Sequence, residues 1–224
     1  MASLEQSRTK LAGEADLVQK KAFTKWINSH LEKVGLEVRD LFEDLRDGTK
    51  LLTLLELFTG KKMHREKGKM RVHHIQNVKT AINYLTDVRK IRIVGIPVEE
   101  IVDGNRKLTL GLVWMLILNF QLSGALPSKP GQRPKSPMEV SAKEIKKELL
   151  QWAKAATEGY DEVSVTNFHR SWNDGLAFCA IINRHRPDLL DYDDCLGNPP
   201  LDNFEAAFST AEKELGVIRF LDPE

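Results

Sequence analysis

The segment that decides the fold reads DGTKLLTLL over residues 47–55, and it returns as DGLAFCAII over residues 174–182. In both copies an Asp-Gly pair precedes apolar residues at helical spacing. This pattern predicts a turn, an aspartate cap and then a buried helix. Two more landmarks recur 126 positions apart, Trp26 as Trp152 and Asn77 as Asn203. Landmarks that return at nearly one offset predict a duplicated domain.

The chain divides into four parts around this duplication. Residues 1–14 show no helical periodicity and are expected to form a flexible N-terminal arm. The two copies cover residues 15–122 and 139–224, and four prolines mark a linker over residues 123–138. We therefore expect an all-α protein with two tandem domains, each a compact bundle of about four main helices.

The most apolar helix of the first copy is expected over residues 108–122, where apolar side chains occupy nearly every face. Such a helix belongs in the centre of a core. By the repeat offset its counterpart would begin after Glu224, so the second copy is expected to lack its last helix. Trp26 and Trp152 lie at matching positions and are predicted to anchor the interior of each copy.

The first helix of the first copy is predicted to begin near Asp16, with Val18, Ala22, Trp26 and Ile27 on its buried face and Phe23 and Leu31 at the edges of that face. The opposite face is polar, and it is either a solvated surface or a binding surface. Its members are Gln19, Lys20, Lys21, Thr24, Lys25 and Asn28.

The net charge of +1 conceals an asymmetry between the copies. Residues 14–122 carry 19 Lys or Arg and 14 Asp or Glu, which gives +5, whereas residues 139–224 carry 9 and 17, which gives −8. A basic copy suits an acidic partner, and an acidic copy would be repelled by it or would pair with its sibling.

Motifs of catalysis and cofactor binding are missing from the sequence. It has no phosphate-binding loop, zinc-protease motif or nucleophile elbow, so we predict a protein that is not an enzyme and takes no cofactor. The histidines at 64, 73 and 74 and the aspartates at 191, 193 and 194 lack the spacing of a metal site. The two cysteines form no CxxC pair, and no apolar run reaches the ~20 residues of a membrane span.

A basic segment over residues 61–71 carries six Lys or Arg against one Glu. It is a solvated loop, a contact for an anionic membrane surface, or a contact for nucleic acid. The near-neutral whole and the acidic second copy argue against nucleic acid as a partner.

Several motifs together resemble the tandem calponin-homology actin-binding region of the spectrin, α-actinin and plakin group. In the first copy they are QKKAFTKWIN over residues 19–28, DLRDG over 44–48, EIVDGN over 100–105 and KLTLGLVW over 107–114. In the second copy they are NFHRSWNDG over 167–175, RHRPDL over 184–189 and LDPE over 221–224. The motifs of the second copy are most similar to those of α-actinin.

The resemblance implies two calponin-homology domains that bind the side of filamentous actin, mainly through the first domain, with the second modulating affinity. It places actin contacts within residues 18–31, 108–122 and about 141–152. The candidates there are Gln19, Lys20, Lys21, Thr24, Lys25, Asn28, Lys107, Leu108, Thr109, Asn119, Gln121, Lys143 and Lys147.

The resemblance also implies weaker phosphoinositide binding within residues 160–186, for which the available cations are Arg170, Arg184 and Arg186. It implies a cytoplasmic protein of the actin cytoskeleton at the cell cortex, with oligomerisation, if any, through regions beyond Glu224. A membrane-surface or phosphoinositide-binding module and a signalling adaptor are the alternatives that the residues leave open.

Overall fold

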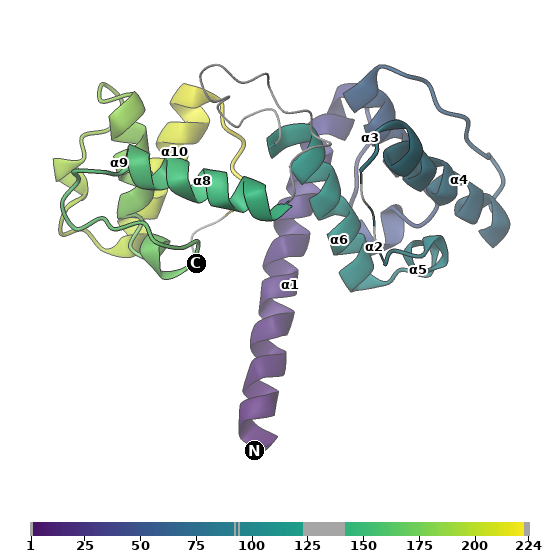
Figure 1. The fold of residues 1–224 in the computed structure, drawn as a ribbon, viewed down its shortest axis with the longest axis horizontal. Helices are drawn as coiled ribbons and strands as arrows, with labels where there is room; N and C mark the ends of the chain where they lie inside the picture. Colours follow the sequence, from purple (N-terminus) through teal and green to yellow (C-terminus); the bar gives the residue numbers. More distant parts are fainter. Residues whose placement is uncertain (1, 92, 94, 123–141, 222–224) are drawn as a thin grey trace. The chain divides into compact units, whose positions relative to one another are not determined.

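A computed structural model describes residues 2–91, 93, 95–122 and 142–221 (Figure 1). Every regular element within these residues is helical, which confirms the predicted all-α class. The chain separates into two compact units, Met1–Val140 and Ser141–Glu224, called unit 1 and unit 2 below. Within the described residues, no helix is both long and apolar enough to cross a membrane.

Unit 1 is built from nine helical segments within its described residues. In chain order they are α1 (Ala2–Leu31), η1 (Glu32–Val34), α2 (Leu41–Asp44), α3 (Thr49–Thr59), α4 (Arg71–Asn83), η2 (Tyr84–Val88), α5 (Val98–Val102), α6 (Arg106–Ile117) and η3 (Leu118–Leu122). Helix α3 packs against α1 and α4, and α6 packs against α1, α2 and α5. The predicted central helix is confirmed, because α6 buries side chains along most of its length.

Helix α1 reaches back to Ala2, so residues 2–13 are helical where the sequence predicts an arm without periodicity. The stretch is rich in alanine, leucine, glutamate, lysine and arginine, which favour the helix without needing a buried face. Absence of hydrophobic periodicity therefore did not exclude a helix here.

The repeated landmarks meet at one joint in each unit. Gly48, before α3, has a φ of 73°, and a Cβ added to it would lie 2.7 Å from the Asn77 Cβ. The Asn77 side-chain amide donates to the Asp47 carbonyl at 3.0 Å. Only glycine combines a positive φ with so close a contact between its backbone and Asn77. The Asp-Gly pair and the asparagine together therefore fix the start of α3 against α4.

Unit 2 repeats this arrangement around α9. Its described segments are α8 (Ala142–Ala156), η4 (Arg170–Trp172), α9 (Leu176–His185), η5 (Asp193–Cys195) and α10 (Pro200–Leu215). Gly175 has a φ of 78°, its added Cβ would lie 2.7 Å from the Asn203 Cβ, and Asn203 donates to the Asp174 carbonyl at 3.0 Å. The duplication predicted from the sequence is thus visible in matched backbone geometry.

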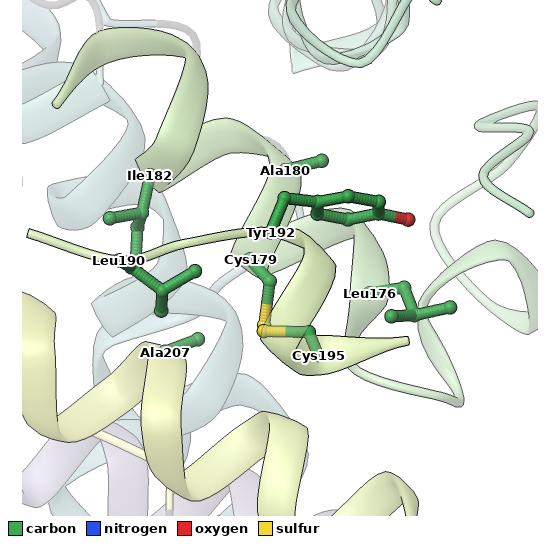
Figure 2. Packing of buried hydrophobic residues seen from close by; sticks show 8 residues of the cluster. All are labelled: Leu176, Cys179, Ala180, Ile182, Leu190, Tyr192, Cys195 and Ala207. Carbon is green, nitrogen blue, oxygen red and sulfur yellow. The ribbon is translucent and has the colours of Figure 1, made fainter. Parts of the chain in front are cut away.

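The larger core cluster of unit 2 lies where α9, η5 and α10 meet (Figure 2). It consists of Leu176, Cys179, Ala180, Ile182, Leu190, Tyr192, Cys195 and Ala207. The described part of unit 2 contains no counterpart of α6. Many of its apolar side chains are correspondingly exposed, among them Leu201, Leu215, Val217 and Ile218.

The prediction that both repeated tryptophans anchor a core is right for Trp26 and wrong for Trp152. Trp26 is 2% exposed, but Trp152 is 39% exposed. Trp152 borders an open hollow of about 440 Å³ together with Ala156, Arg184 and His185. In unit 1 the segment after α6 covers the matching residue, Trp26. No described residue of unit 2 covers Trp152 in this way.

Candidate binding surfaces

The buried face of α1 is rotated from the predicted one. Phe23, Trp26, Ile27 and Leu31 are buried, whereas Val18 is 49% exposed. The prediction that Val18 faces the core is therefore wrong, because the buried stripe follows the spacing of 23, 27 and 31. That spacing was readable in the sequence as a second helical register.

Three of the six predicted polar-face residues are half-buried and make hydrogen bonds within unit 1. Lys20 Nζ donates to Asp40 Oδ2 at 2.6 Å and lies 4.9 Å from the centre of the Phe42 ring. Asn28 both donates to the Val38 carbonyl and accepts from the Val38 amide. Thr24 donates to the Lys20 carbonyl at 2.7 Å. The Lys20 and Asn28 contacts hold α1 to the chain segment that leads into α2, whereas the Thr24 bond lies within α1.

The pair of Lys20 and Asp40 also affects the pKa of the carboxyl at the start of α2. Asp40 is the N-cap of α2 and accepts from the amides of Phe42 and Glu43. The hydrogen bond from Lys20 is the main cause that lowers the pKa of the Asp40 carboxyl. Lys20 therefore has an ion-pair partner on its own domain.

The outward surface of α1 combines apolar and polar side chains. Leu17, Val18, Gln19 and Lys21 are exposed, and Lys25 is half-buried beside them. Two adjacent apolar residues in contact with solvent at this position were not predicted. Together these residues form a mixed patch, called the α1 patch below and defined as Leu17, Val18, Gln19 and Lys21.

The predicted contacts on α6 and η3 are largely used within unit 1. Thr109 is 1% exposed, so the prediction that it contacts a partner is wrong. The Asn119 amide donates to the Met115 carbonyl at 2.7 Å, and Gln121 Oε1 accepts from the Trp26 indole. Lys107 and Gln121 are exposed and Leu108 and Asn119 are half-buried, so these four remain candidates.

On α8 the predicted lysines face solvent. Lys143 and Lys147 are exposed, while Ile145 between them is buried. Glu144 and Glu148 flank these lysines in the sequence, so the helix offers no uniformly basic face.

The three arginines predicted to bind phosphoinositides do not form one open cluster. Arg184 donates to the backbone carbonyls of Ala156 and Glu158, and its guanidinium lies 5.0 Å from the centre of the Tyr160 ring. Arg186 makes two hydrogen bonds with Asp188, at 2.9 and 2.7 Å. Arg170 is exposed at the start of η4. Two of the three guanidiniums therefore already have acceptors within unit 2.

The basic segment of unit 1 is partly neutralised. Lys62 and Arg65 pair with Glu56, and Arg71 pairs with Asp103. Lys61, Lys67 and Lys69 are exposed, with exposed Met70 and Val72 at the end of the segment. Within the described part of the chain, no group of three or more His, Cys, Asp or Glu could hold a metal ion.

Comparison with known proteins gives the family and its relatives. The family model described as "Calponin homology (CH) domain" matches residues 17–122 and 143–224. The mouse erythrocytic spectrin beta chain is 45% identical over 223 residues, which are 98% of this chain and 10% of that protein. Mouse microtubule-actin cross-linking factor 1 is 46% identical over 220 residues, which are 98% of this chain and 3% of that protein.

An alpha-actinin from Dermatophagoides farinae is 46% identical over 207 residues, which are 92% of this chain and 22% of that protein. The chain therefore spans a small part of these relatives, and the similar identities favour none of the three groups over the others. The crystal structure of the actin-crosslinking core of Schizosaccharomyces pombe fimbrin matches with a TM-score of 0.72 and 24% identity. This match covers 93% of this chain and 44% of that one, and it supports the fold.

Proposed function

The chain belongs to the calponin homology (CH) domain family, and from this premise we propose that it binds the side of actin filaments. We propose that unit 1 supplies most of the affinity, that unit 2 modulates it, and that no catalysis is involved. The names of two similar proteins support the proposal, since one is a microtubule-actin cross-linking factor and the other an actin-crosslinking core.

The α1 patch is the observation that carries the proposal. Leu17 and Lys21 are one helical turn apart, so they lie on the same side of α1 and can meet one partner together. The apolar pair of Leu17 and Val18 offers area that becomes buried on binding, and the lysine offers attraction to an acidic filament. Lys107 adds a second exposed cation within unit 1.

The charge of the two domains supports a division of labour. The first copy carries +5 and the second −8. An acidic filament attracts the first and repels the second, so unit 2 on its own is expected to bind weakly. The exposed Lys143 and Lys147 are its candidate contacts.

Co-sedimentation of the whole chain with actin filaments tests the proposal. The double substitution Leu17→Ser and Lys21→Glu should weaken binding about tenfold or more, since it removes both kinds of contact in the patch. Lys79→Glu is the matched control, because it reverses the charge of an exposed lysine on α4. Binding should also weaken as salt rises from about 0.05 to 0.2 M.

Two outcomes would contradict the proposal in different ways. Unchanged binding by a folded double variant would move the site away from α1. Failure of the parent chain to pellet with filaments at low salt would remove actin as its partner. We place the protein in the actin cytoskeleton of the cytoplasm, at the cell cortex.

An anionic membrane surface is the second candidate partner, favoured by the exposed Lys61, Lys67 and Lys69 beside Met70 and Val72. Each cation near such a surface contributes about 1 kcal/mol. Sedimentation with phosphatidylserine vesicles, compared with phosphoinositide vesicles, would separate this general attraction from a specific headgroup site near Arg170. Loss of vesicle binding in Lys67→Glu, with filament binding retained, would assign the two surfaces to different partners.

A further inference from the structure

The two cysteines of the chain meet inside unit 2, although they are 16 positions apart. Cys179 lies on α9 and Cys195 ends η5, and both belong to the same buried cluster. Figure 2 shows their side chains directed toward one another within this cluster. Both cysteines are buried, and neither is joined in a disulfide.

Packing alone does not require a thiol at Cys179. In the first copy the repeat places Leu52 at the matching position, and Leu52 is also fully buried. The polar contacts of the thiols are weak ones for sulfur: Cys179 Sγ lies 3.5 Å from the Asn203 carbonyl oxygen, and Cys195 Sγ lies 3.7 Å from that of Asp191. An aliphatic side chain would fill the same space. The presence of two neighbouring thiols therefore suggests a chemical role for them.

We propose that Cys179 and Cys195 are a modification site, a buried dithiol that a low-molecular-weight disulfide such as oxidised glutathione converts into an intramolecular disulfide. The Cys195 thiolate attacks one sulfur of the reagent, forming a mixed disulfide and releasing one glutathione thiolate, which takes up a proton. The Cys179 thiolate then attacks Cys195 Sγ and releases the second glutathione. The protein loses two protons and two electrons, and the reagent is reduced to two thiols.

Cys195 is the attacking residue for two reasons. Burial raises the pKa of both thiols, but the neighbouring Cys179 thiol acts in the opposite direction on the pKa of Cys195. Cys195 also sits at the end of a single helical turn between exposed Asp194 and Gly197, so a local opening suffices to bring it to solvent. Cys179 is held in the middle of α9, so it reacts second, with the Cys195 mixed disulfide inside the core.

Burial makes the reaction slow, so the site is expected to respond to sustained oxidising conditions and not to brief ones. The disulfide would close the loop of residues 179–195 and fasten η5 to α9. By thermodynamic linkage, the factor by which folding favours the disulfide equals the factor by which the disulfide favours folding.

The test is an equilibrium titration of the whole chain in glutathione redox buffers, in native buffer and in urea, quenched by alkylation and followed by mass spectrometry. The product expected is a monomer that has lost two hydrogen atoms. The effective concentration of the pair should be about tenfold or more higher in native buffer than in urea. A ratio of one or less would overturn the proposal, as would glutathione adducts on both cysteines or a disulfide-linked dimer.

Single substitutions supply the controls. Cys179→Ala and Cys195→Ala each keep one thiol and should give no product that lacks two hydrogens. Thermal unfolding gives a second readout, because oxidation should raise the midpoint of the unit 2 transition in the parent chain and leave both variants unchanged. A parent chain whose midpoint falls on oxidation would show that the native geometry does not accept the bond.

Discussion

Trp26 and Trp152 occupy matching positions of the repeat, yet one is enclosed and the other is open to solvent. Trp26 lies 5.6 Å from the Phe58 ring centre, and Phe120 stacks on Phe58 at 4.7 Å. In unit 2 the position of Phe58 belongs to His185, whose ring lies 5.9 Å from Trp152. No described residue of unit 2 takes the place of Phe120. A residue in the right register is therefore not enough for burial, because a core also needs the helix that covers it.

The largest expected difference between the units is the cost of removing these tryptophans. Trp26→Ala should destabilise unit 1 by roughly 3–5 kcal/mol, because it leaves a cavity among Phe58, His30 and Gln121. Trp152→Ala should cost unit 2 about 1–2 kcal/mol, because its side chain is already 39% exposed.

Urea unfolding of both variants, followed by circular dichroism, measures this difference. Equal costs at the two positions would mean that Trp152 is covered in solution. In that case its fluorescence would also be shielded from a neutral quencher as strongly as that of Trp26.

The second difference lies in the asparagines of the two joints. The Asn77 side chain donates to the carbonyls of Asp47 and Glu66 and accepts from the Glu66 amide at 2.7 Å. Among the described residues, the Asn203 side chain makes only the bond to the Asp174 carbonyl, and its buried Oδ1 has no hydrogen-bond partner there.

Asn77→Ala should therefore destabilise unit 1 by about 2–3 kcal/mol, whereas Asn203→Ala should cost unit 2 about 1 kcal/mol. Chemical denaturation of the same chain carrying each substitution checks the ranking. Gly48→Ala and Gly175→Ala serve as references, since both meet an asparagine Cβ at 2.7 Å and should be similarly severe. A larger cost at Asn203 than at Asn77 would break the comparison.

The features that could be predicted from the sequence are those that local sequence patterns control. The Asp-Gly turns before α3 and α9, the helical class and the buried α6 were all predicted, because each follows from spacing and turn chemistry. The aspartates stabilise these turns but are not the helix caps that the sequence predicts. Asp47 accepts from the Thr49 amide and Asp174 from the Leu176 amide, while Gly48 and Gly175 occupy the N-cap positions.

The errors fall where distant residues decide. The sequence did not reveal that the Asn28 amide bonds to the backbone of Val38, ten positions away. Thr109 was assigned to a partner, yet its place on α6 is packed against the rest of unit 1. Helical periodicity defines a face but does not reveal which loop returns to cover it.

The smallest expected difference between the units concerns their loss of stability at low pH. Asp40 in unit 1 and Asp188 in unit 2 both have a lowered carboxyl pKa, the first mainly through Lys20 and the second mainly through Arg186. A carboxyl whose folded pKa is lowered adds stability above its unfolded pKa and loses it as the pH falls through the folded value. The Lys20 pair joins residues 20 positions apart, whereas Arg186 and Asp188 are near neighbours that can meet in the unfolded chain as well. Lys20→Met should therefore flatten the loss of unit 1 stability between about pH 5 and pH 2, and Arg186→Met should leave unit 2 nearly unchanged over the same range. Urea midpoints measured at several pH values would show this. A clear effect of Arg186→Met would mean that the local pair forms only on folding, and that the two carboxylates are equivalent.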